Sequence, residues 1–195
     1  MTVKLRLFIA FVALALLSGC ASFRSGETKN LGEWPQAKEQ KPSLRYVVQG
    51  KQIINGQPAA IAPNGMKMWS DIVGKSYTES GLFSSVNEGF GDADILAEVK
   101  ITNDGEGSMA LAFLSGFTFC VLPATAKDTV ITETVYRDRN GNVLGEIKKQ
   151  DSMRTWFQIL LLPGAFIANP ISVGPQIQYD NHKASILAAR ERGLF

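Results

Sequence analysis

The sequence predicts an α+β domain, in which an antiparallel sheet is covered on one face by two helices. Several short stretches alternate apolar and polar residues, as half-buried strands do. Two other stretches place apolar residues at helical spacing, and an Asn-Gly pair between two alternating stretches predicts a hairpin. The expected order is β(β)–α–β–β–β–α, and two uncharged apolar insertions are expected at one pole of the sheet.

The strands follow from alternation and from the turns that bound it. Asn55-Gly56 is expected to end the second strand, and Asn140-Gly141 is expected to join the last two. The predicted strands are Leu44–Gln49, Lys51–Ile54, Ile95–Thr102, Thr129–Arg137 and Val143–Lys149.

Two helices are predicted from spacing and from cap residues. The first is expected to begin after Asn64 and to end at Gly81, with Leu82 and Phe83 tucked beneath the same sheet. Its apolar face consists of Met66, Trp69, Ile72, Val73 and Tyr77. The second is expected to be capped by Asp180 and stopped by Gly193, with Ala184, Ile186, Leu187 and Ala188 as its apolar residues.

The N-terminal stretch predicts export. Lys4 and Arg6 precede the apolar run Leu7–Leu17, and small residues lead up to Cys20. This arrangement is typical of a secretory signal, and a short membrane anchor is the alternative. The run is too short to cross a bilayer as a helix, because each helical residue adds only about 1.5 Å.

Leu17-Ser18-Gly19-Cys20 resembles the lipobox of bacterial lipoproteins. The resemblance implies that residues 1–19 are removed as a signal peptide and that Cys20 carries acyl chains as the first residue of the mature protein. Ala21, and not Asp, follows the cysteine, which in enteric-type bacteria implies sorting to the outer membrane. Several acyl chains on one residue give stable anchoring, whereas a single chain is marginal.

The mature chain divides into a tether and one domain. Residues 20–43 are polar and rich in Ser, Gly, Lys and Glu, so they predict a lipidated flexible tether. Trp34 is the exception, and it either docks on the domain or lies at a lipid interface. Residues 44–195 are expected to form a single α+β domain.

Charge and cysteine content exclude several classes of protein. Removal of residues 1–19 takes away Lys4 and Arg6, so 20 − 2 = 18 basic residues balance 18 acidic ones. This balance gives no basic field for nucleic acid and no polybasic patch for anionic lipid. Acylation of Cys20 leaves Cys120 without a disulfide partner, and we expect a buried, inert thiol there.

Two long stretches lack Asp, Glu, Lys and Arg: residues 108–126 and 155–179. Antiparallel pairing of the three strands around them places both insertions at the same pole of the sheet. Two interpretations remain open: the insertions are core, or they form an apolar platform that contacts a bilayer or a partner. The candidate contact residues are Phe113, Phe117, Phe119, Trp156, Phe157, Leu160, Leu161 and Phe166.

No pattern predicts catalysis, a metal or a cofactor. His182 is the only histidine, and we expect it on the surface in the first turn of the last helix. A hydrolase would need it as the base, but no G-x-S-x-G or S-x-x-K setting occurs. Glu88, Asp92 and Asp94 do not have EF-hand spacing, so a solvated turn is expected there.

The helix ending in Ser80-Gly81-Leu82-Phe83, followed by Ala93-Asp94-Ile95-Leu96, resembles a unit of small Gram-negative envelope lipoproteins. Similar units occur in penicillin-binding-protein activators, the TolB N-terminal domain and auxiliary lipoproteins of lipid-transport ABC systems. The resemblance implies a periplasm-facing protein on the outer membrane. The first hypothesis is a non-enzymatic protein that acts through an unknown envelope protein partner in envelope assembly or maintenance. The alternative is a lipid-handling accessory whose insertions contact acyl chains.

Overall fold

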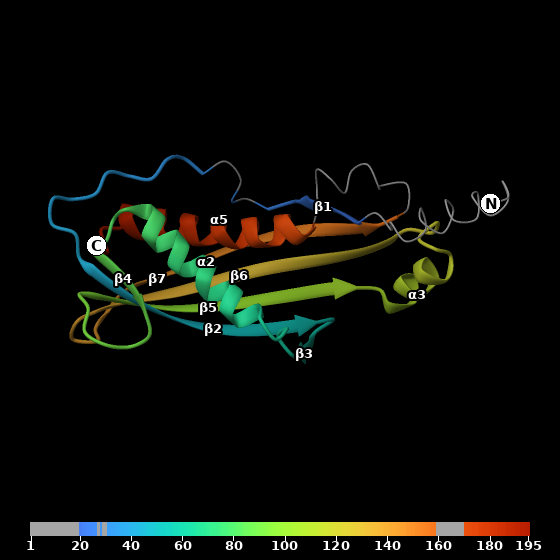
Figure 1. The fold of residues 1–195 in the computed structure, drawn as a ribbon, viewed down its shortest axis with the longest axis horizontal. Coiled ribbons are helices and arrows are strands. Elements are labelled where there is room, and N and C mark those ends of the chain that lie inside the picture. The colour runs from blue at the N-terminus through green and yellow to red at the C-terminus, as the bar shows by residue number, and fades with distance from the viewer. Residues whose placement is uncertain (1–19, 27, 29–30, 159–169) are drawn as a thin grey trace, which may run out of the picture.

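The computed structural model describes residues 20–26, 28, 31–158 and 170–195. These residues form one seven-stranded sheet and three helices, which confirms the α+β class (Figure 1). The strands are β1 (Cys20–Arg24), β2 (Ser43–Ile54), β3 (Gln57–Ala59), β4 (Ser85–Glu88), β5 (Ile95–Gly107), β6 (Ala124–Asp138) and β7 (Val143–Phe157). The helices are α2 (Gly65–Ser80), α3 (Met109–Phe117) and α5 (Pro170–Glu191).

The sheet is mixed, so the prediction of a purely antiparallel sheet is wrong. Its order is β1-β7-β6-β5-β2-β3, with β4 also paired to β2. β2 runs parallel to both β4 and β5, whereas the other neighbours are antiparallel. The reason is α2, which follows β2 and carries the chain back so that β5 starts at the same end as β2.

The turns lie where the sequence predicts them, but the strands are longer. Asn140-Gly141 joins β6 to β7, and the carboxylate of Asp138 accepts hydrogen bonds from the backbone N–H groups of Asn140 and Asn142. Residues 43–54 form one strand, where two were expected, because pairing with β5 is continuous from Leu44 to Ile54. β5, β6 and β7 contain 13, 15 and 15 residues.

α2 confirms the helix predicted after Asn64. Its buried apolar residues are Trp69, Val73 and Tyr77. Gly81 ends the helix in the left-handed conformation, with φ of 65°, and Leu82 and Phe83 are buried as expected. Asn64 occupies the N-cap position, but its side chain makes no capping hydrogen bond. Figure 1 shows α2 and α5 together over one face of the sheet.

α5 begins ten residues earlier than predicted, at Pro170 and not at Asp180. Asp180 therefore lies within the helix, and much of the expected insertion 155–179 belongs to regular structure. Residues 155–157 end β7, residues 170–179 start α5, and 159–169 lie outside the described residues. The sequence does not predict this first part of the helix because Gly174 and Pro175 are both unfavourable inside helices.

His182 is buried, so the prediction of a surface histidine is wrong. Only 2% of the residue is exposed, because it belongs to the part of α5 that packs on the sheet. Its neighbours Asn181 and Ser185 are buried as well and bond to Val130 and Thr134 of β6. Burial lowers the pKa of His182 to about 3.

The first residues of the predicted tether form strand β1, which corrects the expectation of flexibility there. β1 pairs antiparallel with β7, and Ala21 and Ser22 are buried. Ser22 and Thr155 share a hydrogen bond of 2.6 Å between their hydroxyl groups. Trp34 packs against the core beneath the ammonium group of Lys183, so docking of this residue is confirmed.

Candidate functional site

The carboxyl ends of β5 and β7 and the start of β6 meet at one pole of the sheet. Gly107 lies opposite Ala126, and Ala124 lies opposite Phe157. The first insertion leaves from this pole, and β7 ends at it, which confirms the position inferred from antiparallel pairing. Figure 1 shows α3 beyond the end of β5 and far from the C-terminus.

Residues 109–122 form an exposed apolar tip at this pole. The hydroxyl of Ser108 caps α3 by accepting a hydrogen bond from the backbone N–H of Leu111. The large apolar side chains of the tip are 46% to 78% exposed, and Ser115 is the buried residue of α3. The apolar tip comprises Met109, Leu111, Phe113, Leu114, Phe117, Phe119, Val121 and Leu122. The interpretation as core is therefore wrong for this insertion.

A tight turn follows α3 and returns the chain to β6. Phe119 and Cys120 have φ values of 52° and 59°, which side chains other than glycine seldom adopt. The backbone N–H of Cys120 donates to the carbonyl of Ser115 over 2.7 Å and holds the turn closed. The thiol belongs to a residue of intermediate exposure, so the expectation of a buried cysteine is not met.

A sharp step in charge separates the tip from the rest of the domain. Glu106, Lys127 and Arg154 lie side by side on β5, β6 and β7, and Phe23 of β1 lies opposite Arg154. We call these three charged residues the charged rung. Between the rung and the pole, the described residues of these four strands and of α3 include no Asp, Glu, Lys or Arg.

The predicted lipidation residue lies at this same pole. Cys20 is paired in register with Phe157, which in turn lies opposite Ala124 at the start of β6. Trp156 is partly exposed between the rung and the pole, as one of the expected contact residues. Leu160, Leu161 and Phe166 lie outside the described residues.

An apolar groove of about 300 Å³ lies beneath α3. Its lining includes Ile54, Met109, Ala112, Ala124 and Phe157. Asp128 also borders the groove, and burial raises the pKa of its carboxyl group. The groove therefore presents an apolar surface with two acids, Glu106 and Asp128, at its border.

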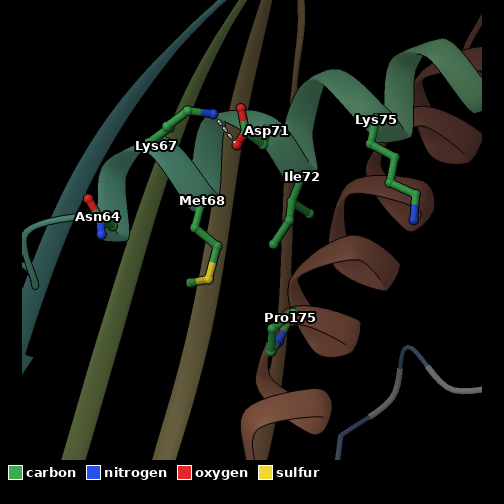
Figure 2. A pocket seen from close by; sticks show the side chains of 7 residues that line it. All are labelled: Asn64, Lys67, Met68, Asp71, Ile72, Lys75 and Pro175. Carbon is green, nitrogen blue, oxygen red and sulfur yellow. Dashed lines mark hydrogen bonds and ion pairs between the residues drawn. The ribbon is translucent and has the colours of Figure 1, made fainter.

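A second, wider groove of about 370 Å³ lies between α2 and the start of α5. Figure 2 shows Met68 and Ile72 directed from α2 toward Pro175 of α5, with a Lys67–Asp71 ion pair along the rim of α2. The ion pair spans 2.6 Å and is solvated, as is common for charges four residues apart on a helix. The residues that line this groove include no Ser, Thr, Cys or His.

Two of the three acidic residues singled out in the sequence, Glu88 and Asp94, bond to protein groups. The carboxylate of Asp94 accepts hydrogen bonds from Ser43 and pairs with Arg139, and these bonds to Ser43 lower its pKa. Glu88 accepts a hydrogen bond from Ser70 over 2.5 Å. The described part of the chain contains no group of three His, Cys, Asp or Glu that could hold a metal ion. No helix in that part is both long and apolar enough to cross a bilayer.

Comparison with known proteins gives distant structural likenesses. No family model matches the chain, and no curated protein does. A PelC dodecamer from Paraburkholderia phytofirmans, in a single-residue variant form, is 9% identical, with a TM-score of 0.39 over 84% of this chain and 95% of that one. A putative neuraminyllactose-binding hemagglutinin homolog from Helicobacter pylori is 10% identical, with a TM-score of 0.40 over 82% of this chain and 89% of that one. At these values the likeness carries no argument about function.

Proposed function

We propose that this protein is a non-enzymatic, lipid-anchored envelope protein, held on the periplasmic face of the outer membrane by acyl chains on Cys20. It acts through protein–protein contact in envelope assembly or maintenance. The lipobox resemblance suggests the anchor. The observation that carries the proposal is the place of Cys20, which begins a strand of the sheet at the pole with the apolar tip.

A buried ion-pair cluster supports the idea that the anchor also orients the domain. The guanidinium of Arg24 donates to the carboxylate of Asp151 over 2.6 Å and pairs with Asp180 of α5. The Asp151 side chain is fully buried, and the hydroxyl of Thr28 donates to it as well. Arg24 lies only four residues after Cys20, so its ion pairs join the anchored strand to both β7 and α5.

An anchor at the pole of Cys20 directs the opposite pole of the domain into the periplasm. It carries the turn between β6 and β7 and the loop after β4, both rich in charged and polar residues. Phe90 in that loop is 73% exposed, and Arg45 donates to its carbonyl. Aromatic residues, Phe included, are enriched at protein–protein interfaces relative to the rest of the protein surface. We propose this pole for the envelope partner.

The groove beneath α3 favours a second candidate function. A lipid-handling accessory needs an apolar surface close to the membrane, and the groove has one at the pole of Cys20. The two candidates differ in what accompanies the purified protein. A stoichiometric lipid identified by mass spectrometry favours lipid handling, whereas a protein partner without lipid favours the first proposal.

Metabolic labelling with a radioactive fatty acid tests the anchor. We expect the wild-type protein to incorporate label and to fractionate with the outer membrane, and the Cys20→Ser variant to lose the label. Cys120→Ser is the matched control, because it removes the other thiol and is expected to keep the label. Persistent label in Cys20→Ser contradicts the proposal.

A further inference from the structure

We propose that the apolar tip inserts into the same lipid leaflet that holds the acyl chains of Cys20, with the charged rung at the level of the headgroups. This second membrane contact rests on the proposed function, since it takes the anchor at Cys20 as given. The occupant of the apolar surface is therefore a lipid leaflet. The tip is a docking element of the folded domain, separate from the acyl group.

The first argument is the concentration of exposed apolar side chains. Single exposed apolar residues are ordinary on protein surfaces, but a contiguous patch marks a contact site. Here eight large apolar residues are exposed within the 14 residues from Met109 to Leu122. Phe113 and Phe117 lie one turn apart on α3, so their rings occupy one face of the helix.

The second argument is length. α3 has 9 residues, which give a helix of about 14 Å at 1.5 Å per residue. A bilayer has a hydrocarbon core of about 30 Å, so α3 does not cross it. A short uncharged helix at the end of a domain has the dimensions of an element that enters one leaflet only.

The third argument is depth. Phe157 lies three residues beyond Arg154 on β7, which is about 10 Å at 3.3 Å per residue. The polar region of one leaflet is about 5 to 8 Å thick. Cys20 is the register partner of Phe157. When the charged rung lies at the outer headgroups, Cys20 therefore reaches the boundary with the acyl chains. An acylated cysteine must lie at the acyl boundary. The placement of the charged rung at the headgroups therefore puts Cys20 at the depth that its acylation requires.

The residues between the rung and the pole fit the same placement. Trp156 lies two residues beyond Arg154, at the interfacial level that tryptophan prefers in membranes. Lys127 lies between Arg154 and Glu106 at the rung, so the rung places charged side chains of both signs at the level of the polar headgroups. If the tip bound a second copy of the protein, the charged rung would have no reason to lie at a fixed distance from the acylated residue. Insertion into a leaflet requires that distance, so a leaflet is the better occupant.

Vesicle flotation of the unacylated mature chain tests this inference. Residues 20–195 carrying Cys20→Ser are mixed with vesicles of phosphatidylethanolamine and phosphatidylglycerol. We expect this chain to float, and we expect Phe113→Asp with Phe117→Asp to lower the bound fraction at least tenfold. The thermal melt of the double variant is expected to stay unchanged, because both side chains are exposed.

Phe90→Asp is the matched control, since Phe90 is equally exposed at the opposite pole. We expect this variant to float like the parent chain. Vesicles with brominated acyl chains are expected to quench tryptophan fluorescence, and Trp156→Phe is expected to remove most of that quenching.

Three results overturn the inference: failure of the folded parent chain to float, equal loss of binding in Phe90→Asp, or tip-dependent dimers that do not bind vesicles. None of these results bears on fatty-acid labelling of Cys20. Conversely, persistent label in Cys20→Ser contradicts the anchor without changing the flotation result. The two proposals therefore fail in distinguishable ways.

Discussion

His182 shows at the scale of one residue how burial sets a response to pH. Its Nε2 atom has no hydrogen-bond partner among the described residues, and burial lowers its pKa from the ordinary 6.5 to about 3. The unfolded chain therefore binds a proton at a pH where the folded chain does not. This group leaves stability unchanged above pH 6.5 and reduces it as pH falls from 6.5 toward 3.

We expect the free energy of unfolding to fall by up to about 1.4 kcal/mol per pH unit in this range because of His182. Urea denaturation at pH 7.5, 6.0 and 5.0 measures the effect in the wild type and in His182→Gln. The comparison ends at pH 5, above the ordinary pKa values of Asp and Glu, and the contribution of Asp128, whose pKa is raised, is common to both proteins. A loss of stability that is equal in both proteins over this range contradicts the buried neutral state of His182.

At the scale of the element, Arg24 secures β1 to the rest of the domain. Arg24→Met leaves the buried carboxylate of Asp151 without its cation, and breaking such a pair from one side costs about 3 to 5 kcal/mol. We expect a loss near the lower value, because Thr28 and a backbone N–H still donate to Asp151. Chemical denaturation measures the loss, and hydrogen exchange is expected to become faster in β1.

Lys67→Met is the matched control for Arg24→Met. It breaks an ion pair of similar length, but both partners are largely exposed on α2. Solvated pairs of this kind contribute less than about 1 kcal/mol. Similar losses in the two variants contradict the role of Arg24 as a buried clamp.

At the scale of the whole molecule, the long strands set the distance between the two poles. β6 contains 15 residues, so the Cα atoms of its first and last residues are 14 steps apart, about 46 Å at 3.3 Å per residue. We expect a nitroxide at Asn140→Cys, in acylated protein carrying Cys120→Ser, to be relaxed by a water-soluble nickel chelate. The same label at Phe117→Cys is expected to respond to lipid-soluble oxygen. Equal relaxation of the two labels by the nickel chelate and by oxygen contradicts a domain whose tip lies in the leaflet and whose opposite pole lies in water.

Local sequence patterns were sufficient to predict the elements that depend on residues close together in the sequence. α2 follows from the spacing of Trp69, Val73 and Tyr77, and the β6–β7 hairpin follows from Asn140-Gly141. Both depend on side-chain period or turn conformation, which a single stretch of sequence displays. α5 was recognised only in its second half, because Gly174 and Pro175 disfavour helix locally while packing on the sheet stabilises it.

The candidate site was predicted in part. The absence of charge in residues 108–126 and the antiparallel strands around them were enough to place this insertion at one pole. Composition could not decide between core and surface, since a buried strand and an exposed tip are equally apolar. The charged rung was also missed, because Glu106, Lys127 and Arg154 become neighbours only through strand register.

Contiguous residues were enough to predict an export signal, the α+β class and the two uncharged stretches, because each of these depends on local composition or side-chain period. Tertiary structure alone decided that β1 joins β7, that His182 is buried and that the apolar tip is exposed. The physical reason is that burial depends on which elements meet. α5 packs on the sheet and buries His182 between them, whereas α3 lies beyond the end of β5, where most of its side chains stay exposed.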